Sequence, residues 1–237
     1  MKKIPWSYLL SANILIIAGI LALAIGGSKT VTTLSENAPL PERKCIIIDP
    51  GHGGVDGGAT SCTGVLESKI NLEISLRFRD LANLIGIKTA MIRTDDRSVF
   101  TEGESIAAKK VSDLKNRVKI ANNTQNATLL SIHQNFFTDD RYWGAQVFYS
   151  KSEESKTFAL ELQKAFIDTL NSGSKRTAKQ ASGIYLMDNI QCPGVLVECG
   201  FLSNHHEADL LCSADYQKKL CCVLACVSSR YLYSDYA

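Results

Sequence analysis

Residues 45–58 read C-I-I-I-D-P-G-H-G-G-V-D-G-G, and this stretch predicts the first strand of an α/β sheet. The three isoleucines at 46–48 are typical of a strand that is buried on both faces. The D-P-G turn at 49–51 ends the strand, because proline lacks an N–H for the ladder and glycine permits a sharp turn. His52 therefore lies just beyond the carboxyl end of a buried strand, where ligands bind in open α/β sheets.

Strands and helices alternate along the rest of the chain. After Glu67, apolar residues at helical spacing predict a helix with Ser68 as its N-cap and Gly86 at its end. Further strands are expected at 87–93, 128–133, 144–150, 183–187 and 194–198, further helices at 112–123, 153–170, from about 204 and at 215–231, and polar loops at 94–110 and 171–182. This alternation predicts one α/β domain with a largely parallel sheet.

Composition and charge exclude some classes of protein. The 237 residues are 45% hydrophobic, which is enough for one good-sized core. The formal net charge of +2 is too balanced to indicate a nucleic-acid-binding protein. The eight cysteines show no C-x-x-C pair, so we expect them to be reduced and mostly buried.

The N-terminal region differs in character from the rest. Two lysines precede an almost wholly apolar run, so residues 1–27 are interpreted as a signal peptide or membrane anchor, with an uncleaved anchor slightly favoured. Residues 28–43 are polar, contain two prolines and are interpreted as a linker. The folded domain is expected to occupy residues 44–237.

Three polar residues end apolar strands, namely His52, His133 and Glu198, and Glu67 opens the helix after the first of these strands. A shared sheet edge would gather them in one crevice. Two histidines and one glutamate form a catalytic zinc set that leaves a position for water. Such a site also needs a carboxylate that carries protons, and Glu198 fits this role because it follows a buried V-L-V run.

Each of these residues also has an ordinary structural explanation. A histidine at a strand end can simply form hydrogen bonds in a loop, and Glu67 could favour a helix N-terminus through the macrodipole. Asp56 is a candidate partner for a ligand histidine and the next candidate for the base. Cys199 as a nucleophile is disfavoured because alternation places it opposite Glu198. His205 and His206 are interpreted as surface or capping residues.

Four motifs in this order resemble the zinc-dependent N-acetylmuramoyl-L-alanine amidases of the amidase-3 family. They are D-P-G-H-G-G-V-D-G-G at 49–58, Glu67 with its helix, S-I-H-Q-N at 131–135 and V-L-V-E-C-G-F-L-S-N at 195–204. The resemblance covers about residues 44–231.

The resemblance implies a zinc ion held by His52, Glu67 and His133, with Glu198 as the catalytic residue. It implies a twisted, mostly parallel six-stranded sheet with helices on both faces. The implied reaction is hydrolysis of the amide between N-acetylmuramic acid and L-alanine of the peptidoglycan stem peptide. Another zinc peptidase and a catalytically silent wall-binding module are the alternatives.

Within the family, the chain is most similar to the germination-specific spore-cortex amidases. Gln134, the S-D-L-K-N-R run at 112–117 and a single catalytic domain behind an N-terminal segment carry this similarity. It implies export to the forespore or cell envelope and a part in forming muramic-δ-lactam.

The expected partners follow from the same interpretation. They are peptidoglycan, a membrane through the N-terminal segment, and an accessory activator protein, but no nucleic acid. The basic loop at 171–182 could meet the carboxylates of stem peptides through Lys175, Arg176 and Lys179. Asn135, Arg176 and Lys179 are the substrate-binding candidates.

Overall fold

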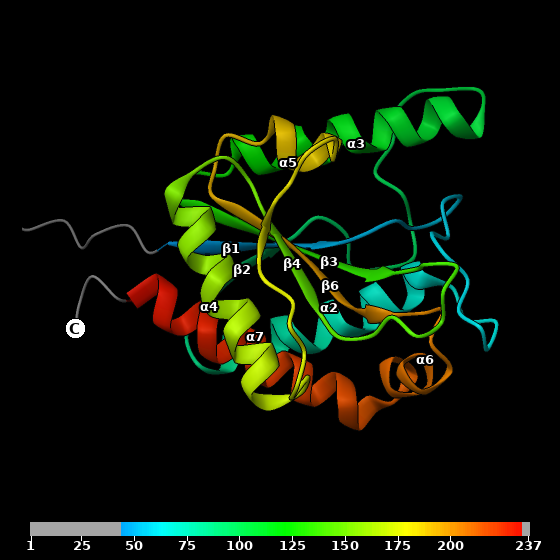
Figure 1. Ribbon diagram of the computed structural model, residues 1–237. Helices are drawn as coiled ribbons and strands as arrows, with labels where there is room; N and C mark the ends of the chain where they lie inside the picture. The colour runs from blue at the N-terminus through cyan, green and yellow to red at the C-terminus, as the bar shows by residue number, and fades with distance from the viewer. Residues whose placement is uncertain (1–43, 234–237) are drawn as a thin grey trace, which may run out of the picture. The chain divides into compact units, whose positions relative to one another are not determined.

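Strand β1 is buried along its whole length, as its isoleucine run predicts, and it lies inside a six-stranded sheet (Figure 1). The order is β2-β1-β3-β6-β4-β5, in which only the β4–β6 pair is antiparallel. The expectation of a mostly parallel six-stranded sheet is therefore confirmed. The strands are β1 (Cys45–Pro50), β2 (Lys88–Met91), β3 (Ala127–Asn135), β4 (Gln146–Tyr149), β5 (Lys179–Gln180) and β6 (Gly194–Phe201).

This computed structural model describes residues 44–233. The expected signal or anchor at 1–27 and the linker at 28–43 lie outside the described residues. Within 44–233, no helix has the length and apolar character needed to span a bilayer.

Helices cover both faces of the sheet. They are α2 (Glu67–Leu84), α3 (Ile106–Asn123), α4 (Glu153–Thr169), α5 (Tyr185–Asn189), α6 (His205–Cys212) and α7 (Ala214–Tyr233). One core cluster joins Ile46 and Ile48 to α2, α4 and α7, and a second joins Ile47 and Leu129 to α3 and α5. Figure 1 shows these two helix layers on opposite sides of the strands. Successive side chains of β1 point to opposite faces of the sheet, so one run of isoleucines contributes to both core clusters.

The start of α2 differs from the prediction. Its N-cap is Leu66, not Ser68, and no side chain caps it. The N–H of Glu67 donates to the carbonyl of Ala59 at 2.8 Å, and that of Ser68 donates to Gly57 at 3.0 Å. Because the glycine-rich loop itself satisfies these exposed helix donors, no capping side chain is required.

The prediction of a strand at 183–187 is wrong. Residues 185–187 belong to helix α5 instead. The strand that completes the six-stranded sheet is β5, which lies inside the expected loop 171–182. Short apolar runs cannot be assigned by periodicity alone. Leu186 and Met187 are buried in the α3–α5 core cluster, so this packing selects the helix. Helix α3 also begins earlier than expected, at Ile106, with Ser105 as its N-cap.

Strands β3 and β6 run past the residues that were expected to end them. His133 and Glu198 are direct partners within the ladder, whereas the next pair is Asn135 with Phe201. Strand β6 thus carries one extra residue between these pairs, which is a β-bulge. The buried carboxylate of Glu207 stabilises this region by accepting from the N–H of Phe201 at 2.7 Å.

The eight cysteines all lie in the described part of the chain, and none forms a disulfide. Cys45, Cys199 and Cys221 are buried, while Cys62, Cys222 and Cys226 are exposed. The thiols are therefore free as expected, but fewer of them are buried than the apolar pattern indicated.

Replacing Glu207 tests how the bulge is held. Its carboxylate also accepts from the N–H of Gly144 at 2.8 Å. Glu207→Ala leaves two buried amides without an acceptor, at a cost of about 1–3 kcal/mol each. Urea unfolding should show this loss, whereas Asp209→Ala on the exposed side of the same helix should change stability little. Equal unfolding midpoints for the two variants would contradict this role.

Candidate metal centre

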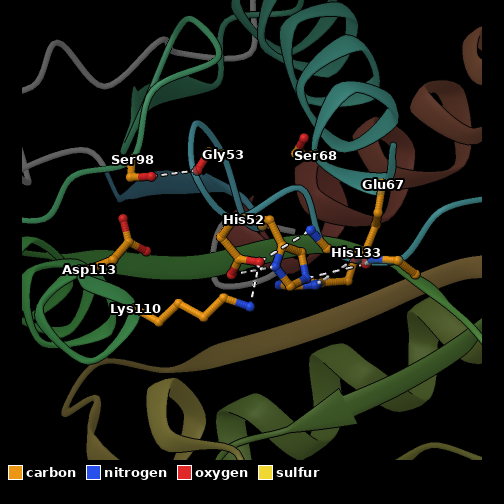
Figure 2. A network of polar contacts seen from close by, with 12 residues as sticks. His52, Gly53, Glu67, Ser68, Ser98, Lys110, Asp113 and His133 are labelled. Atoms are coloured by element: carbon orange, nitrogen blue, oxygen red, sulfur yellow. Dashed lines mark hydrogen bonds and ion pairs between the residues drawn. The ribbon is translucent and has the colours of Figure 1, made fainter. Parts of the chain in front are cut away.

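The side chains of His52, Glu67 and His133 converge at the carboxyl edge of β1 and β3 (Figure 2). Each offers one ligand atom, and these atoms all lie within 4.8 Å of one another. The two imidazole rings meet edge to face, with centroids 4.9 Å apart. Three residues that are far apart in sequence therefore form a cluster that could hold a metal ion.

Glu67 joins the two histidines. Its Oε1 lies 3.0 Å from Nδ1 of His133, and its Oε2 lies 3.3 Å from Nε2 of His52. The N–H groups of Gln134 and Ala59 donate to the same carboxylate at 3.1 and 3.0 Å. Burial alone would raise the pKa of Glu67, but the bonds to the histidines lower it far below its usual range. The carboxylate is therefore ionised and fixed in place, as a metal ligand must be.

A second carboxylate, that of Asp56, contacts the ring nitrogen of His52 that does not face Glu67. Nδ1 of His52 lies 3.0 Å from Oδ2 of Asp56, and Nζ of Lys110 on α3 lies 2.7 Å from the other oxygen (Figure 2). Burial opposes a charged imidazole, but Asp56 and Glu67 raise the pKa of His52 to about 9. The expected role of Asp56 as a partner of a ligand histidine agrees with this geometry.

Two positions around the cluster require glycine. A Cβ at Gly51 would overlap the ring of His133. Gly58 has φ 69°, and a Cβ there would lie 2.6 Å from Oε2 of Glu67. The glycine-rich loop thus lets the backbone approach the side chains of His133 and Glu67 closely.

Arg117 holds the turn that carries His52, a role that the sequence analysis did not assign. Its guanidinium forms a buried ion pair with Asp49 and donates to the carbonyls of Pro50 at 2.9 Å and His52 at 2.6 Å. Burial would raise the pKa of Asp49, but the charge of Arg117 and the hydroxyl of Ser131 lower it. Arg117 is the last residue of the S-D-L-K-N-R run, so this motif serves the site from α3.

Arg93 supports the same turn from the other side. This buried side chain donates to the carbonyls of Pro50, Gly51 and Ser68, each at 2.9 Å. His52 itself has φ 59°, in the left-handed region that residues other than glycine seldom adopt. Two guanidinium groups therefore fix a strained backbone at the residue that presents the imidazole.

Glu198 lies beside the cluster. It pairs with His133 across the β3–β6 ladder, and its Oε2 is buried without a hydrogen-bond partner among the described residues. Burial, the main cause, raises the pKa of Glu198 to about 7; the charge of Glu67 adds to this and His133 opposes it. A carboxyl group with this pKa can accept and return a proton near neutral pH.

The remaining candidates from the sequence lie outside the His–Glu–His cluster. Asn135 is at the end of β3, on the same face as His133 by strand alternation. Arg176 donates to the carbonyl of Trp143 at 3.0 Å, and Lys179 begins β5. His205 and His206 are exposed in the first turn of α6, as expected for surface residues, and Asn204 caps that helix.

Comparisons with known proteins identify the family. Residues 46–224 match the family model described as Amidase_3: N-acetylmuramoyl-L-alanine amidase. The chain belongs to this amidase family. The germination-specific N-acetylmuramoyl-L-alanine amidase of Bacillus subtilis is 40% identical over 179 residues, 75% of each chain. The enzyme class is therefore established, and it favours the amidase over both alternatives.

Solved structures agree with this assignment. The amidase matches the CwlD amidase of Clostridioides difficile, solved in complex with the GerS lipoprotein, with a TM-score of 0.78 and 36% identity over 81% of this chain and all of that one. The catalytic domain of CwlV from Bacillus (Paenibacillus) polymyxa matches with a TM-score of 0.67 and 28% identity, covering 80% of this chain and 98% of that one. The amidase thus shares its whole catalytic fold with these enzymes.

Arg117→Met should weaken both the fold and the cluster. It leaves the carboxylate of Asp49 buried and unpaired, which typically costs about 3–5 kcal/mol. In the native protein the lowered pKa of Asp49 contributes stability above its unfolded pKa, and this is lost as the pH falls through the folded value. In the variant burial should raise that pKa above the unfolded value instead, so the loss of stability should be largest near neutral pH and should shrink as acid protonates the buried Asp49. Urea unfolding between pH 3 and 8 measures both effects.

The control is Lys115→Met, an exposed residue on the same helix. An Arg117→Met protein whose stability and pH profile match those of this control would show that the ion pair does not hold the turn.

Proposed function

We propose that the amidase is a zinc enzyme that cleaves the bond between N-acetylmuramic acid and L-alanine of the stem peptide, with His52, Glu67 and His133 as the metal ligands. The observation that carries this is the preorganised His–Glu–His cluster next to Glu198, whose Oε2 is buried without a hydrogen-bond partner among residues 44–233. Imidazole nitrogen and carboxylate oxygen suit Zn²⁺, and three protein ligands leave a position open for chemistry.

The residues of the site have separate roles in this reaction. Bound zinc would supply Lewis-acid polarisation of the scissile carbonyl and would acidify water. Glu198 accepts the proton from the attacking water and returns it to the amine of L-alanine as the C–N bond breaks. Asp56 and Lys110 hold the ring of His52 in its orientation, and the buried bonds of Glu67 keep its carboxylate aimed at the cluster.

The biological setting is part of the same proposal. Similarity to the germination-specific enzyme supports action on spore cortex, where removal of the stem peptide leads to muramic-δ-lactam. The apolar run at 1–27 supports export and anchoring through a signal or membrane segment, followed by the linker at 28–43. The relative solved with a lipoprotein supports an accessory protein that acts on this amidase.

Removing one imidazole should abolish metal binding and turnover together. His52→Ala or His133→Ala leaves a two-ligand site, which holds zinc poorly. Metal analysis after dialysis, together with mass spectrometry of digested muropeptides, measures both losses. His205→Ala, an exposed histidine on α6, is the matched control and should keep both properties. Full zinc occupancy in either cluster variant would overturn the ligand assignment.

Glu198→Gln separates chemistry from binding. The amide keeps the size of the side chain but cannot accept the proton, so turnover should fall by about two to four orders of magnitude. Zinc content and unfolding midpoint should stay near the native values. A variant that lost its zinc would make Glu198 a ligand, and one with near-native turnover would move the base elsewhere, with Asp56 the next residue to replace.

A further inference from the structure

A polar groove of about 420 Å³ opens on the β4 side of the sheet, outside the metal cluster. None of its lining residues is acidic. They are Arg141, Tyr142, Trp143, Gln146, Lys179 and the segment 173–177. The groove thus brings together four cationic side chains and two aromatic ones, which come from two separate loops and from strand β5.

The positive charge of the groove is only partly neutralised. Arg141 is paired with Asp139 at 2.7 Å. The guanidinium of Arg176 lies 4.7 Å from the ring centroid of Phe201, so this arginine also stabilises its loop. Lys175 and Lys179 are exposed and, within residues 44–233, form no ion pair. These two lysines are therefore free to meet an anionic ligand.

Strand register places the groove next to the proposed catalytic residue. Gln146 lines the groove and is the direct partner of Glu198 across the antiparallel β4–β6 pair, so both side chains project from the same face. The Cα atoms of such partners are about 5 Å apart. The buried amide of Gln146 also donates to the carbonyl of Thr177 at 2.7 Å, which fixes the basic segment beside the strand. A substrate lying across Glu198 would therefore continue into the groove.

We propose that this groove binds the acidic stem peptide of the substrate, with Lys175 and Lys179 contacting its carboxylates. The proposal rests on the proposed function and adds a specificity to it. Amidation of the stem glutamate removes one of those carboxylates, so the amidase should prefer the free acid. The half-exposed faces of Tyr142 and Trp143 offer apolar walls for the aliphatic parts of the peptide.

The test replaces both lysines and varies the substrate. Lys175→Gln/Lys179→Gln should raise KM for a soluble disaccharide–tripeptide about three- to tenfold at low salt with kcat unchanged, as expected for two exposed ion pairs. High salt should shrink the difference. Arg176 is left in place because it supports the loop. The control is Lys218→Gln/Lys219→Gln on α7, which covers the opposite face of the sheet.

The amidated substrate completes the experiment. It should raise KM of the native enzyme, and the double groove variant should discriminate less between the two substrates. Titration of the stem tripeptide into the Glu198→Gln protein, once as the free acid and once amidated, should show tighter binding of the free acid without any turnover. Equal KM values for the groove and control variants, or undiminished discrimination by the groove variant, would overturn the proposal. Failure of the native protein to cleave any muropeptide would instead overturn the proposed function. The titration would still show whether the groove binds the stem peptide.

Discussion

The buried contact between Arg117 and Asp49 is the constraint on which the cluster of His52, Glu67 and His133 depends. A single guanidinium on α3 binds the last residues of β1 and the carbonyl of His52, and Arg93 binds the same turn from the segment that follows β2. Both arginines are buried, so their charges must be matched by the carbonyls and carboxylates that they contact. This requirement holds the backbone of His52 at a φ that only a tightly determined turn can maintain.

The other parts of the site are fixed in the same way, by backbone groups. Glu67 is held by amides of Ala59 and Gln134, and α2 begins on carbonyls of the glycine-rich loop. Glu198 differs because one of its oxygens has no such partner. The structure therefore combines rigidly held candidate ligands with the carboxyl group of Glu198, one oxygen of which is buried without a partner in the described part of the chain.

Much of this arrangement could be predicted from sequence. Apolar runs that are followed by His or Glu mark a sheet edge, and they led to His52, His133 and Glu198. Glu67 was found because it opens the helix after the first of these strands. Helix α5 could not be predicted, because Ile184, Leu186 and Met187 fit a short strand equally well and only packing against α3 decides between them. The roles of Arg93 and Arg117 were also missed. Arg117 pairs with Asp113 on its own helix, but what it does for the site depends on the distant Asp49 and on backbone carbonyls. Arg93 likewise contacts carbonyls, and carbonyls leave no mark in a sequence pattern.

The ladder around β3 has a consequence for how the chain folds. Its pairs join residues near 45 to residues near 130, and these to residues near 195, all by parallel crossovers. Such non-local pairings form slowly, and none of them needs a metal ion. His133 meets His52 only after β1 and β3 have paired, so the polypeptide must assemble before the cluster exists. Metal would then bind a finished domain and stabilise it by mass action, rather than serve as a nucleus around which the chain collapses.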